Sequence, residues 1–326
     1  MMVRVSDRDL GVTIDHVDIR VLKERSTLAN TKSISAQKLF TKLDKDIRLK
    51  PKNPYAYNRR GLARYELGDF IGAMADFDLA IEFSSDIGIF YNNRGLVRLE
   101  LGDTDDALAD FDYAILLNPL LAVAYRNRGK IRYQARDKRG AIMDLNRAIQ
   151  IDPQCAKSFY SRGYLKYDLD DLVGAVADFD KSIFFDPLCA KAYNSRGLAM
   201  LDLGKYQQAI IDFDRAINLK PDYIKAYANR GLAKYNLGDD LRAIADFNIV
   251  ISFNAIDAKA YCNRSLARFR SGDRQVAIDE MLRAIELFAL QQRIDLYQQA
   301  QTLLLQMRHK VSPPTAPFLS NGFLLL

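Results

Sequence analysis

The chain has 326 residues but only two histidines and three cysteines, which restricts the chemistry it can support. His16 and His309 lie near opposite ends, and Cys155, Cys189 and Cys262 form no CxxC pair. Metal sites and disulfide frameworks both need such residues at short, regular spacings. We therefore expect no metal site, and the unpaired cysteines indicate a reducing compartment, which we take to be the cytoplasm.

Long apolar runs and nucleotide-binding loops are also missing. No stretch approaches the ~18 apolar residues of a membrane-spanning helix, and the first residues carry charges where a signal peptide needs an apolar core. Neither GxxxxGK[ST] nor GxGxxG occurs. These absences predict no membrane association and no cofactor.

Net charge of one sign is missing from the centre of the chain. The formal charge is +6, but residues 51–291 hold equal numbers of basic and acidic side chains, so the excess lies in the two ends. A neutral centre argues against nucleic-acid binding by the whole surface, because such surfaces are strongly basic.

A strong internal repeat is present instead. Six glycines stand 34 residues apart, and a serine occupies the seventh anchor position: Gly61, Gly95, Gly129, Gly163, Gly197, Gly231 and Ser265. An aromatic residue lies four before each anchor, alanine twelve after it and isoleucine twenty after it. Seven units that agree at this many positions indicate repetition of one structural element.

Each unit reads as two helices. The aromatic residue and the anchor are four apart and share one helical face, and a glycine there leaves room for a second helix. Offsets 12, 16, 19 and 20 form one apolar stripe at helical period. Gly-Asp pairs such as Gly68-Asp69 suit the end of one helix and the start of the next.

The pattern resembles the tetratricopeptide repeat family, with a small anchor, a later Ala-x3-Phe such as Ala73 and Phe77, and a closing proline such as Pro119. The resemblance implies an all-α right-handed superhelical solenoid of helix–turn–helix repeats. Tyrosine or phenylalanine replaces the family's tryptophan, which this chain lacks. Arginine precedes the anchor, and the last two units have no proline.

We divide the chain into five parts. Residues 54–291 form seven repeats, preceded by a half repeat at 35–53 that contributes only a second helix. Residues 292–309 are expected to cap the last repeat, because an open repeat edge needs covering; Ile294, Tyr297, Leu304 and Met307 would share the packing face. Residues 1–34 are an ill-defined segment, and residues 310–326 are expected to form a flexible tail.

The most regular charged residues are an arginine just before each anchor and an acid fifteen after it. We predict that they pair across the two helices, because the planar guanidinium binds a carboxylate through two hydrogen bonds. Catalysis needs two groups in different environments around one cleft, whereas these carboxylates recur identically. We therefore predict that the protein is not an enzyme.

Binding is expected on another stripe of the first helix, at offsets −6, −3, +1 and +4 from the anchor. In the family that this sequence resembles, the stripe lines a concave groove that holds partner peptides. The predicted groove combines asparagines for a peptide backbone, tyrosines and a row of lysines. Its residues are Asn92, Asn127, Tyr133, Lys157, Tyr167, Lys191, Asn194, Lys225, Asn229, Tyr235, Lys259 and Asn263.

The lysines at −6 can be interpreted in two ways: they are the solvated start of a helix, or they form a cationic strip that binds an acidic peptide segment. A lysine at a helix N-terminus opposes the macrodipole, which favours the second reading. Some family members clamp the carboxylate tail of chaperones with an asparagine at +1. Here +1 holds Leu62, Leu96, Lys130 and Tyr164, so that clamp is not reproduced.

We predict a protein–protein interaction scaffold or adaptor that binds a segment of a partner protein. A helical-repeat RNA-binding protein is one alternative, since stacking aromatics and basic grooves also read single strands. A self-assembling structural protein is another. An enzyme with its active site in the ends would have only ~50 or ~35 residues there, too few for a catalytic core.

Overall fold

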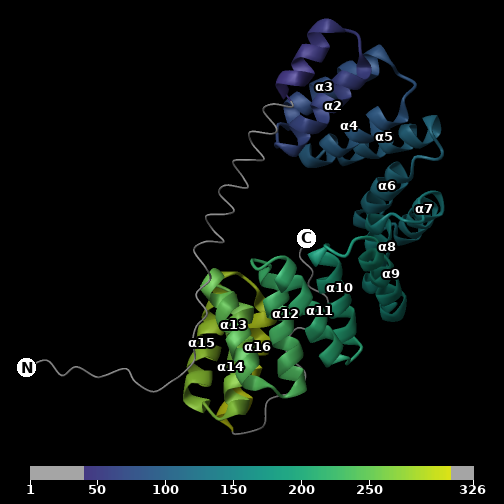
Figure 1. The fold of residues 1–326 in the computed structure, drawn as a ribbon. Coiled ribbons are helices and arrows are strands. Elements are labelled where there is room, and N and C mark those ends of the chain that lie inside the picture. Colours follow the sequence, from purple (N-terminus) through teal and green to yellow (C-terminus); the bar gives the residue numbers. More distant parts are fainter. Residues whose placement is uncertain (1–39, 310–326) are drawn as a thin grey trace, which may run out of the picture. The chain divides into compact units, whose positions relative to one another are not determined.

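The structure is a computed structural model that describes residues 40–309 (Figure 1). Every regular element in this range is an α-helix, which confirms the all-α repeat fold. The predicted segment 1–34 and tail 310–326 lie outside the described residues, as does the beginning of the predicted half repeat. The chain divides into two compact units, Met1–Leu121 and Ala122–Leu326, and each is described separately.

The first unit contains a helix over residues 40–49 followed by two helical hairpins. Leu43 in the first helix is only 1% exposed and occupies the place of the second-helix phenylalanine in a full repeat. The hairpins are α2 (Pro54–Glu66) with α3 (Phe70–Phe83) and α4 (Gly88–Leu101) with α5 (Thr104–Leu117). Helix α3 also packs against α4, so the two hairpins stack.

In residues 122–309, the described part of the second unit, the chain forms five hairpins and one further helix. The helices are α6 (Ala122–Gln134), α7 (Lys138–Ile151), α8 (Ala156–Asp168), α9 (Leu172–Phe185), α10 (Ala190–Asp202), α11 (Tyr206–Leu219), α12 (Ile224–Leu237), α13 (Asp240–Phe253), α14 (Ala258–Ser271), α15 (Arg274–Leu290) and α16 (Ile294–Arg308). We call the even-numbered helices α2 to α14 the A helices and their partners α3 to α15 the B helices. Successive A helices within this unit contact one another.

The turn inside each hairpin requires a left-handed residue seven after the anchor. Five repeats place glycine there, for example Gly102 with φ of 92° and Gly238 with φ of 89°. Arg136 and Asp170 hold the same position with φ of 64° and 63°. A residue with a Cβ pays a steric cost in this conformation, which explains why glycine predominates.

The anchor glycine lets the A and B helices of a hairpin approach closely, as predicted. A Cβ added at Gly231 would lie 2.8 Å from Cε1 of Phe247 and one at Gly197 would lie 2.7 Å from Cε1 of Phe213. Real Cβ contacts are never this short, so the phenylalanine sixteen after the anchor fills the space that the glycine leaves.

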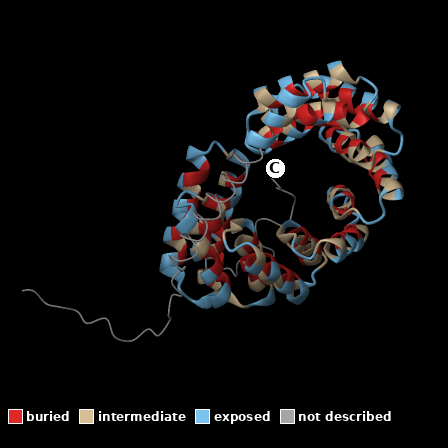
Figure 2. Ribbon diagram, turned by 45° about the horizontal axis from the view of Figure 1, so that its top comes forward, coloured by how far each residue is buried: buried red, intermediate tan, exposed pale blue. Residues whose placement is uncertain are grey.

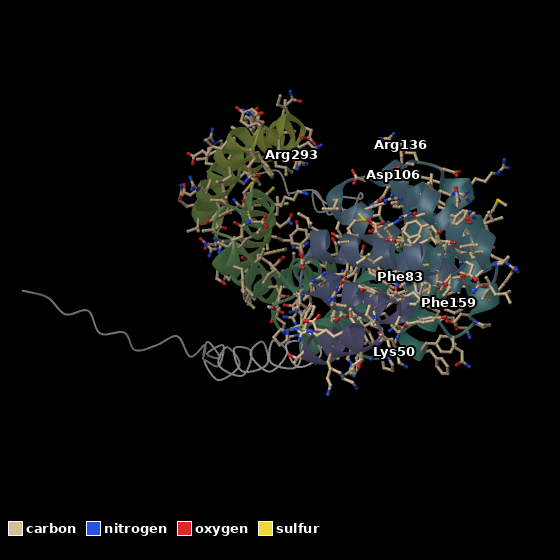
Figure 3. The ribbon with its side chains drawn as sticks, turned by 90° about the horizontal axis from the view of Figure 1, so that it is seen from above. Lys50, Phe83, Asp106, Arg136, Phe159 and Arg293 are labelled. Carbon is tan, nitrogen blue, oxygen red and sulfur yellow. The ribbon has the colours of Figure 1, made fainter. Side chains whose placement is uncertain are left out.

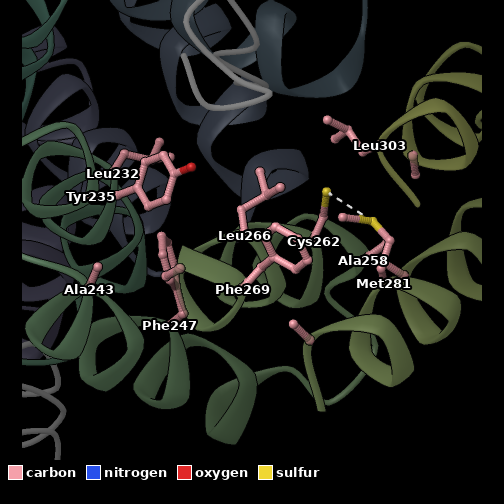
Figure 4. Close-up of a cluster of buried hydrophobic side chains, with 14 of the residues drawn as sticks. Leu232, Tyr235, Ala243, Phe247, Ala258, Cys262, Leu266, Phe269, Met281 and Leu303 are labelled. Carbon is pink, nitrogen blue, oxygen red and sulfur yellow. Dashed lines mark hydrogen bonds between the residues drawn. The ribbon is translucent and has the colours of Figure 1, made fainter. Parts of the chain in front are cut away.

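Buried side chains run along the faces where helices meet (Figure 2). In the second unit one cluster extends from α10 to α16 and includes Phe247, Phe269 and Phe288. In its centre the Cys262 thiol lies 3.8 Å from the Met281 sulfur (Figure 4). Burial raises the pKa of the Cys262 thiol to about 12, so this cysteine behaves as a small apolar residue.

Helix α16 covers the last hairpin, but its packing face differs from the predicted one. Leu304 and Met307 are buried as expected, together with Leu296, Ala300 and Leu303. Ile294, the first residue of the helix, is 68% exposed. The prediction for Ile294 was wrong because helix-wheel geometry does not fix where a contact begins.

No helix in residues 40–309 is long and apolar enough to span a membrane. In the same residues no group of three or more histidine, cysteine or acidic side chains is arranged to hold a metal ion.

Candidate functional site

A row of arginine–carboxylate pairs joins the A and B helices of all seven hairpins, and we call it the polar seam. In each pair Nη2 of the arginine lies 2.6–2.7 Å from one carboxylate oxygen. In the first six, Nε also donates to the acid at 2.8–3.0 Å. The predicted pairing is confirmed. The pairs are Arg60–Asp76, Arg94–Asp110, Arg128–Asp144, Arg162–Asp178, Arg196–Asp212, Arg230–Asp246 and Arg264–Glu280.

A second cation reaches the same carboxylate in six hairpins. It stands three after the anchor, one helical turn from the arginine, at 2.8–3.2 Å from the acid: Arg64, Arg98, Arg132, Lys166, Lys234 and Arg268. The fifth hairpin has Met200 there. Asp212 thus keeps one arginine partner, and its burial raises the pKa of its carboxyl group above the ordinary range.

The seam arginines make two further contacts that bind the repeats together. Each lies over the aromatic ring three residues earlier, for example Arg230 at 5.3 Å from the Tyr227 ring centre. Several also reach the preceding B helix, as Arg230 does to Asp214 at 2.6 Å. The aromatic rings pack on their own B helices; Phe159, which Figure 3 labels, stacks on Phe185 with ring centres 5.8 Å apart. The arginines and carboxylates of the seam therefore stabilise the hairpins, and their opposite charges compensate each other.

The asparagines predicted for the groove lie mostly inside the contacts between neighbouring A helices. Asn92, Asn127, Asn194 and Asn263 are buried, and Asn229 is half-buried. Asn229 Nδ2 donates to Asn194 Oδ1 at 3.0 Å, and Asn92 Nδ2 donates to Asn93 Oδ1 at 3.0 Å. The amides of Asn92, Asn194 and Asn229 therefore bond to neighbouring asparagines, and burial leaves little of Asn127 and Asn263 accessible to a partner backbone.

A pocket of about 320 Å³ opens on the A helices of the second unit. It contains four of the predicted groove residues: Tyr133, Lys191, Asn194 and Lys225. The other residues around it come from α6, α7, α8 and α10 and from the turn before α12. They are Gly129, Lys130, Gln134, Leu145, Tyr160, Ser161, Tyr164, Leu165, Ser195 and Tyr223.

The lining combines aromatic rings with positive charge. Lys130, Lys191 and Lys225 are exposed, and no acidic side chain belongs to the lining. Burial raises the pKa of Tyr160, of Tyr164 and of Tyr223, the last to about 12. The tyrosine hydroxyl groups therefore remain protonated near neutral pH and offer hydrogen-bond donors beside the lysine ammonium groups.

The remaining predicted groove residues do not belong to the lining of this pocket. Lys157 is exposed at the start of α8. Tyr167 donates its hydroxyl hydrogen to Asp202 across the α8–α10 contact. Tyr235 is only 2% exposed and lies under the Arg270 guanidinium, so it belongs to the core. Lys259 is half-buried, and its pKa is lowered by burial and then by the charge of Arg293.

Sequence reasoning missed several pocket residues. Lys130 and Tyr164 stand at offset +1, which belongs to the predicted stripe. The residues at this offset were used only to show that a chaperone clamp is absent, and they were not assigned to the groove. Ser161 and Ser195 hold the −2 position where neighbouring repeats have Asn127 and Asn229, and a serine leaves more open space than an asparagine. The change from asparagine to serine in two successive units is the signal that marks the pocket.

Comparison with protein families gives two matches. A model described as TPR repeat matches residues 200–238, and a model described as tetratricopeptide repeat matches residues 92–156. The comparison with curated proteins gave no match.

Several solved structures share the fold. The APC/C hetero-tetramer Cut9–Hcn1 has a TM-score of 0.63 at 16% identity, with 79% of this chain and 51% of that chain covered. The Pseudomonas aeruginosa pilF structure has a TM-score of 0.58 at 15% identity, and the match covers 63% of this chain and 93% of that chain. A tetratricopeptide repeat protein from Parabacteroides merdae has a TM-score of 0.54 at 18% identity, and the match covers 77% of this chain and 99% of that chain. At these identities the likeness concerns the fold alone.

Three observations agree: the 34-residue period, the stacked hairpins closed by anchor glycines, and the two family matches inside the repeat region. The chain therefore contains tetratricopeptide repeats, which the two family models match over residues 92–156 and 200–238.

Proposed function

We propose that the protein is a non-enzymatic interaction scaffold that binds a segment of a partner protein across α6, α8, α10 and α12. The observation that carries the proposal is the pocket on these helices, with four tyrosines, three lysines and no acidic residue in its lining. Binding sites for peptides commonly combine apolar or aromatic walls with a few polar groups that fix orientation.

Charge favours a partner segment that contains acidic residues. Lys130, Lys191 and Lys225 approach the opening from three different A helices. A carboxylate placed there gains several ammonium partners and meets no negative side chain in the lining. Electrostatic complementarity of this kind gives specificity and faster association more than raw affinity.

The arrangement of the acids supports the non-enzymatic part of the proposal. In every hairpin the most buried carboxylate pairs with an arginine of the polar seam, so it is neutralised in place. An acid–base pair needs two groups with different environments near a bound molecule, and the seam repeats one environment seven times. A cytoplasmic location belongs to the same proposal and agrees with three free cysteines.

Site-specific photocrosslinking in living cells tests the proposal. A photoreactive amino acid replaces Tyr164 in the pocket, and as a control replaces Phe184, which is 75% exposed on α9. We expect a protein adduct at position 164. The adduct should be lost with Lys191→Glu/Lys225→Glu and retained with Lys181→Glu/Lys205→Glu, two exposed lysines away from the pocket.

The outcomes separate the candidates. Protein adducts only at position 184 would place the binding surface on the B helices and sink the proposal. Adducts to a second copy of the chain at position 164 would favour the self-assembling alternative.

An RNA-binding protein is the second candidate, because tyrosine rings and lysines also hold single-stranded bases and phosphates. An RNA adduct at Tyr164, with an affinity that falls steeply as salt rises, would favour it. The neutral balance of residues 51–291 favours a protein partner.

A further inference from the structure

Three exposed lysines repeat at one position on successive A helices, and we call them the lysine row. Lys157, Lys191 and Lys225 each stand six before the anchor, near the start of α8, α10 and α12. Lys259 continues the pattern in sequence, but it is half-buried beside Arg293, the residue that precedes α16 (Figure 3). The exposed row therefore has three members.

The spacing of the row follows from direct packing of its helices. Tyr160 of α8 lies 3.4 Å from Ser195 of α10 through their hydroxyl groups, and Asn229 of α12 donates to Asn194 of α10 at 3.0 Å. Helices in such contact have axes about 8–10 Å apart. Equivalent lysines therefore recur at roughly this interval.

The interval between equivalent lysines indicates which backbone conformation of a partner segment would match the row. A polyproline II chain has three residues per turn and rises about 3.1 Å per residue, so every third side chain returns to the same side after about 9 Å. A β-strand returns after two residues, at about 6.6 Å. An α-helix is about 10 Å wide, which is large for a 320 Å³ pocket.

The walls of the pocket suit the same conformation. Aromatic-lined grooves bind polyproline II segments well because the chain is already extended and loses little entropy on binding. Tyr133, Tyr160, Tyr164 and Tyr223 supply such walls beside the lysine row. Ser161 and Ser195 are small side chains of the same lining and leave space for a proline or another apolar side chain.

The opposite edge of the A helices determines toward which side of the groove the acidic residues of a partner point. Asp168 and Asp202 stand five after the anchor, near the ends of α8 and α10. Asp168 pairs with Lys138 at 2.8 Å, and Asp202 accepts a hydrogen bond from Tyr167. Acids of a partner would be repelled from this edge and attracted to the lysine row.

Resting on the proposed function, we infer that the bound partner segment is an extended, polyproline II-like stretch with an acidic residue at every third position. Three acids at i, i+3 and i+6 face Lys157, Lys191 and Lys225. An apolar side chain between them enters the tyrosine-lined pocket.

Binding of synthetic peptides to the full chain tests this register. The first peptide is three Glu-Pro-Ala triplets, the second has the same composition with the three glutamates adjacent, and the third replaces glutamate by glutamine. A fourth is an alanine-rich helix with glutamates seven apart. Fluorescence anisotropy gives each Kd, and the triplet peptide should bind about fivefold or more tighter than the second and the fourth.

Variants of the lysine row complete the test. Each of Lys157→Gln, Lys191→Gln and Lys225→Gln should weaken the triplet peptide by roughly 1.5- to 5-fold, the range of an exposed ion pair. Lys181→Gln/Lys205→Gln is the matched control and should leave the Kd unchanged.

The outcomes keep the two proposals distinct. If the triplet and adjacent peptides bind equally and both respond to the lysine variants, the register is wrong and the acidic groove stands. If the helical peptide binds tightest, the extended conformation is wrong. If every peptide binds equally weakly and no lysine variant matters, the proposed function fails together with this inference.

Discussion

The polar seam and the pocket are built on the same helices, and they differ in how regularly their residues recur. The seam uses one arginine and one acid in all seven hairpins, and its groups bind each other. The pocket depends on positions whose residue changes from repeat to repeat, such as −2, where Ser161 and Ser195 interrupt a series of larger side chains.

The difference teaches how to read a repeat. A charged residue that returns in every unit contributes to the contact that every unit needs, which is the junction between its helices. A residue that changes along the array is released from that requirement, so its surroundings depend on the residues that the adjacent repeat places beside it. Each prediction below tests this division, beginning with the largest expected effect.

Removal of a seam carboxylate should cause the largest loss of stability. Asp246 is nearly buried between Arg230 and Lys234, so Asp246→Ala leaves two partly buried cations without their acid. We expect the free energy of unfolding to fall by about 3–5 kcal/mol. Urea denaturation followed by circular dichroism measures it. Asp180→Ala removes an acid that is 52% exposed and should cost no more than about 1 kcal/mol; equal losses for both would contradict the division.

Filling the pocket should change binding and leave stability almost untouched. Ser161→Asn introduces at −2 the residue that the preceding repeat carries, and its larger side chain takes up space in the lining of the pocket. We expect the affinity for the Glu-Pro-Ala peptide to fall roughly tenfold, about 1.4 kcal/mol. Stability should change by about 0.5 kcal/mol or less. Ser161→Ala keeps the space open and is the control; if it weakens binding as much, the hydroxyl group and not the volume is responsible.

A second cation at Asp212 should repair the incomplete seam of the fifth hairpin. Burial raises the pKa of the Asp212 carboxyl group, so the folded state holds its proton more tightly than the unfolded state. Its contribution to stability therefore falls as pH rises above about 4, the unfolded value. Met200→Lys should cancel this fall and stabilise by up to about 1 kcal/mol at pH 7.

The comparison variant for this position is Met200→Gln, which has similar length and no charge. The difference in free energy of unfolding between the lysine and glutamine variants should grow from pH 4 to pH 7. A difference that stays constant over this range would show that the lysine acts by packing and not by pairing with Asp212.

The smallest effect at neutral pH is expected for Tyr223→Phe. The pKa of Tyr223 is raised to about 12, because burial disfavours the phenolate. The folded state therefore keeps the proton while the unfolded state loses it above about pH 10, and stability falls between pH 10 and 12. The phenylalanine variant should match the wild type at pH 7 and exceed it at pH 11. Parallel pH curves for the two chains would count against burial of the phenol.

The hairpins and the seam were predictable from sequence because their residues act within one unit. The anchor glycine and the phenylalanine sixteen later lie in adjacent helices, so their spacing alone predicts close contact. The second cation of the seam was overlooked, although Arg64 and its equivalents also recur with the period. The exception at Met200 gains meaning only beside the burial of Asp212.

The sequence by itself determined the repeat, the helical hairpins and the arginine–acid pairs, because these depend on a local period that every unit obeys. Only the tertiary structure decided which stripe residues are accessible. Asn194 and Tyr235 belong to the stripe that was predicted to line the groove, yet they are buried by the adjacent A helix and by Arg270. Exposure depends on the side chain that the next repeat places alongside, and that is a property of packing between units.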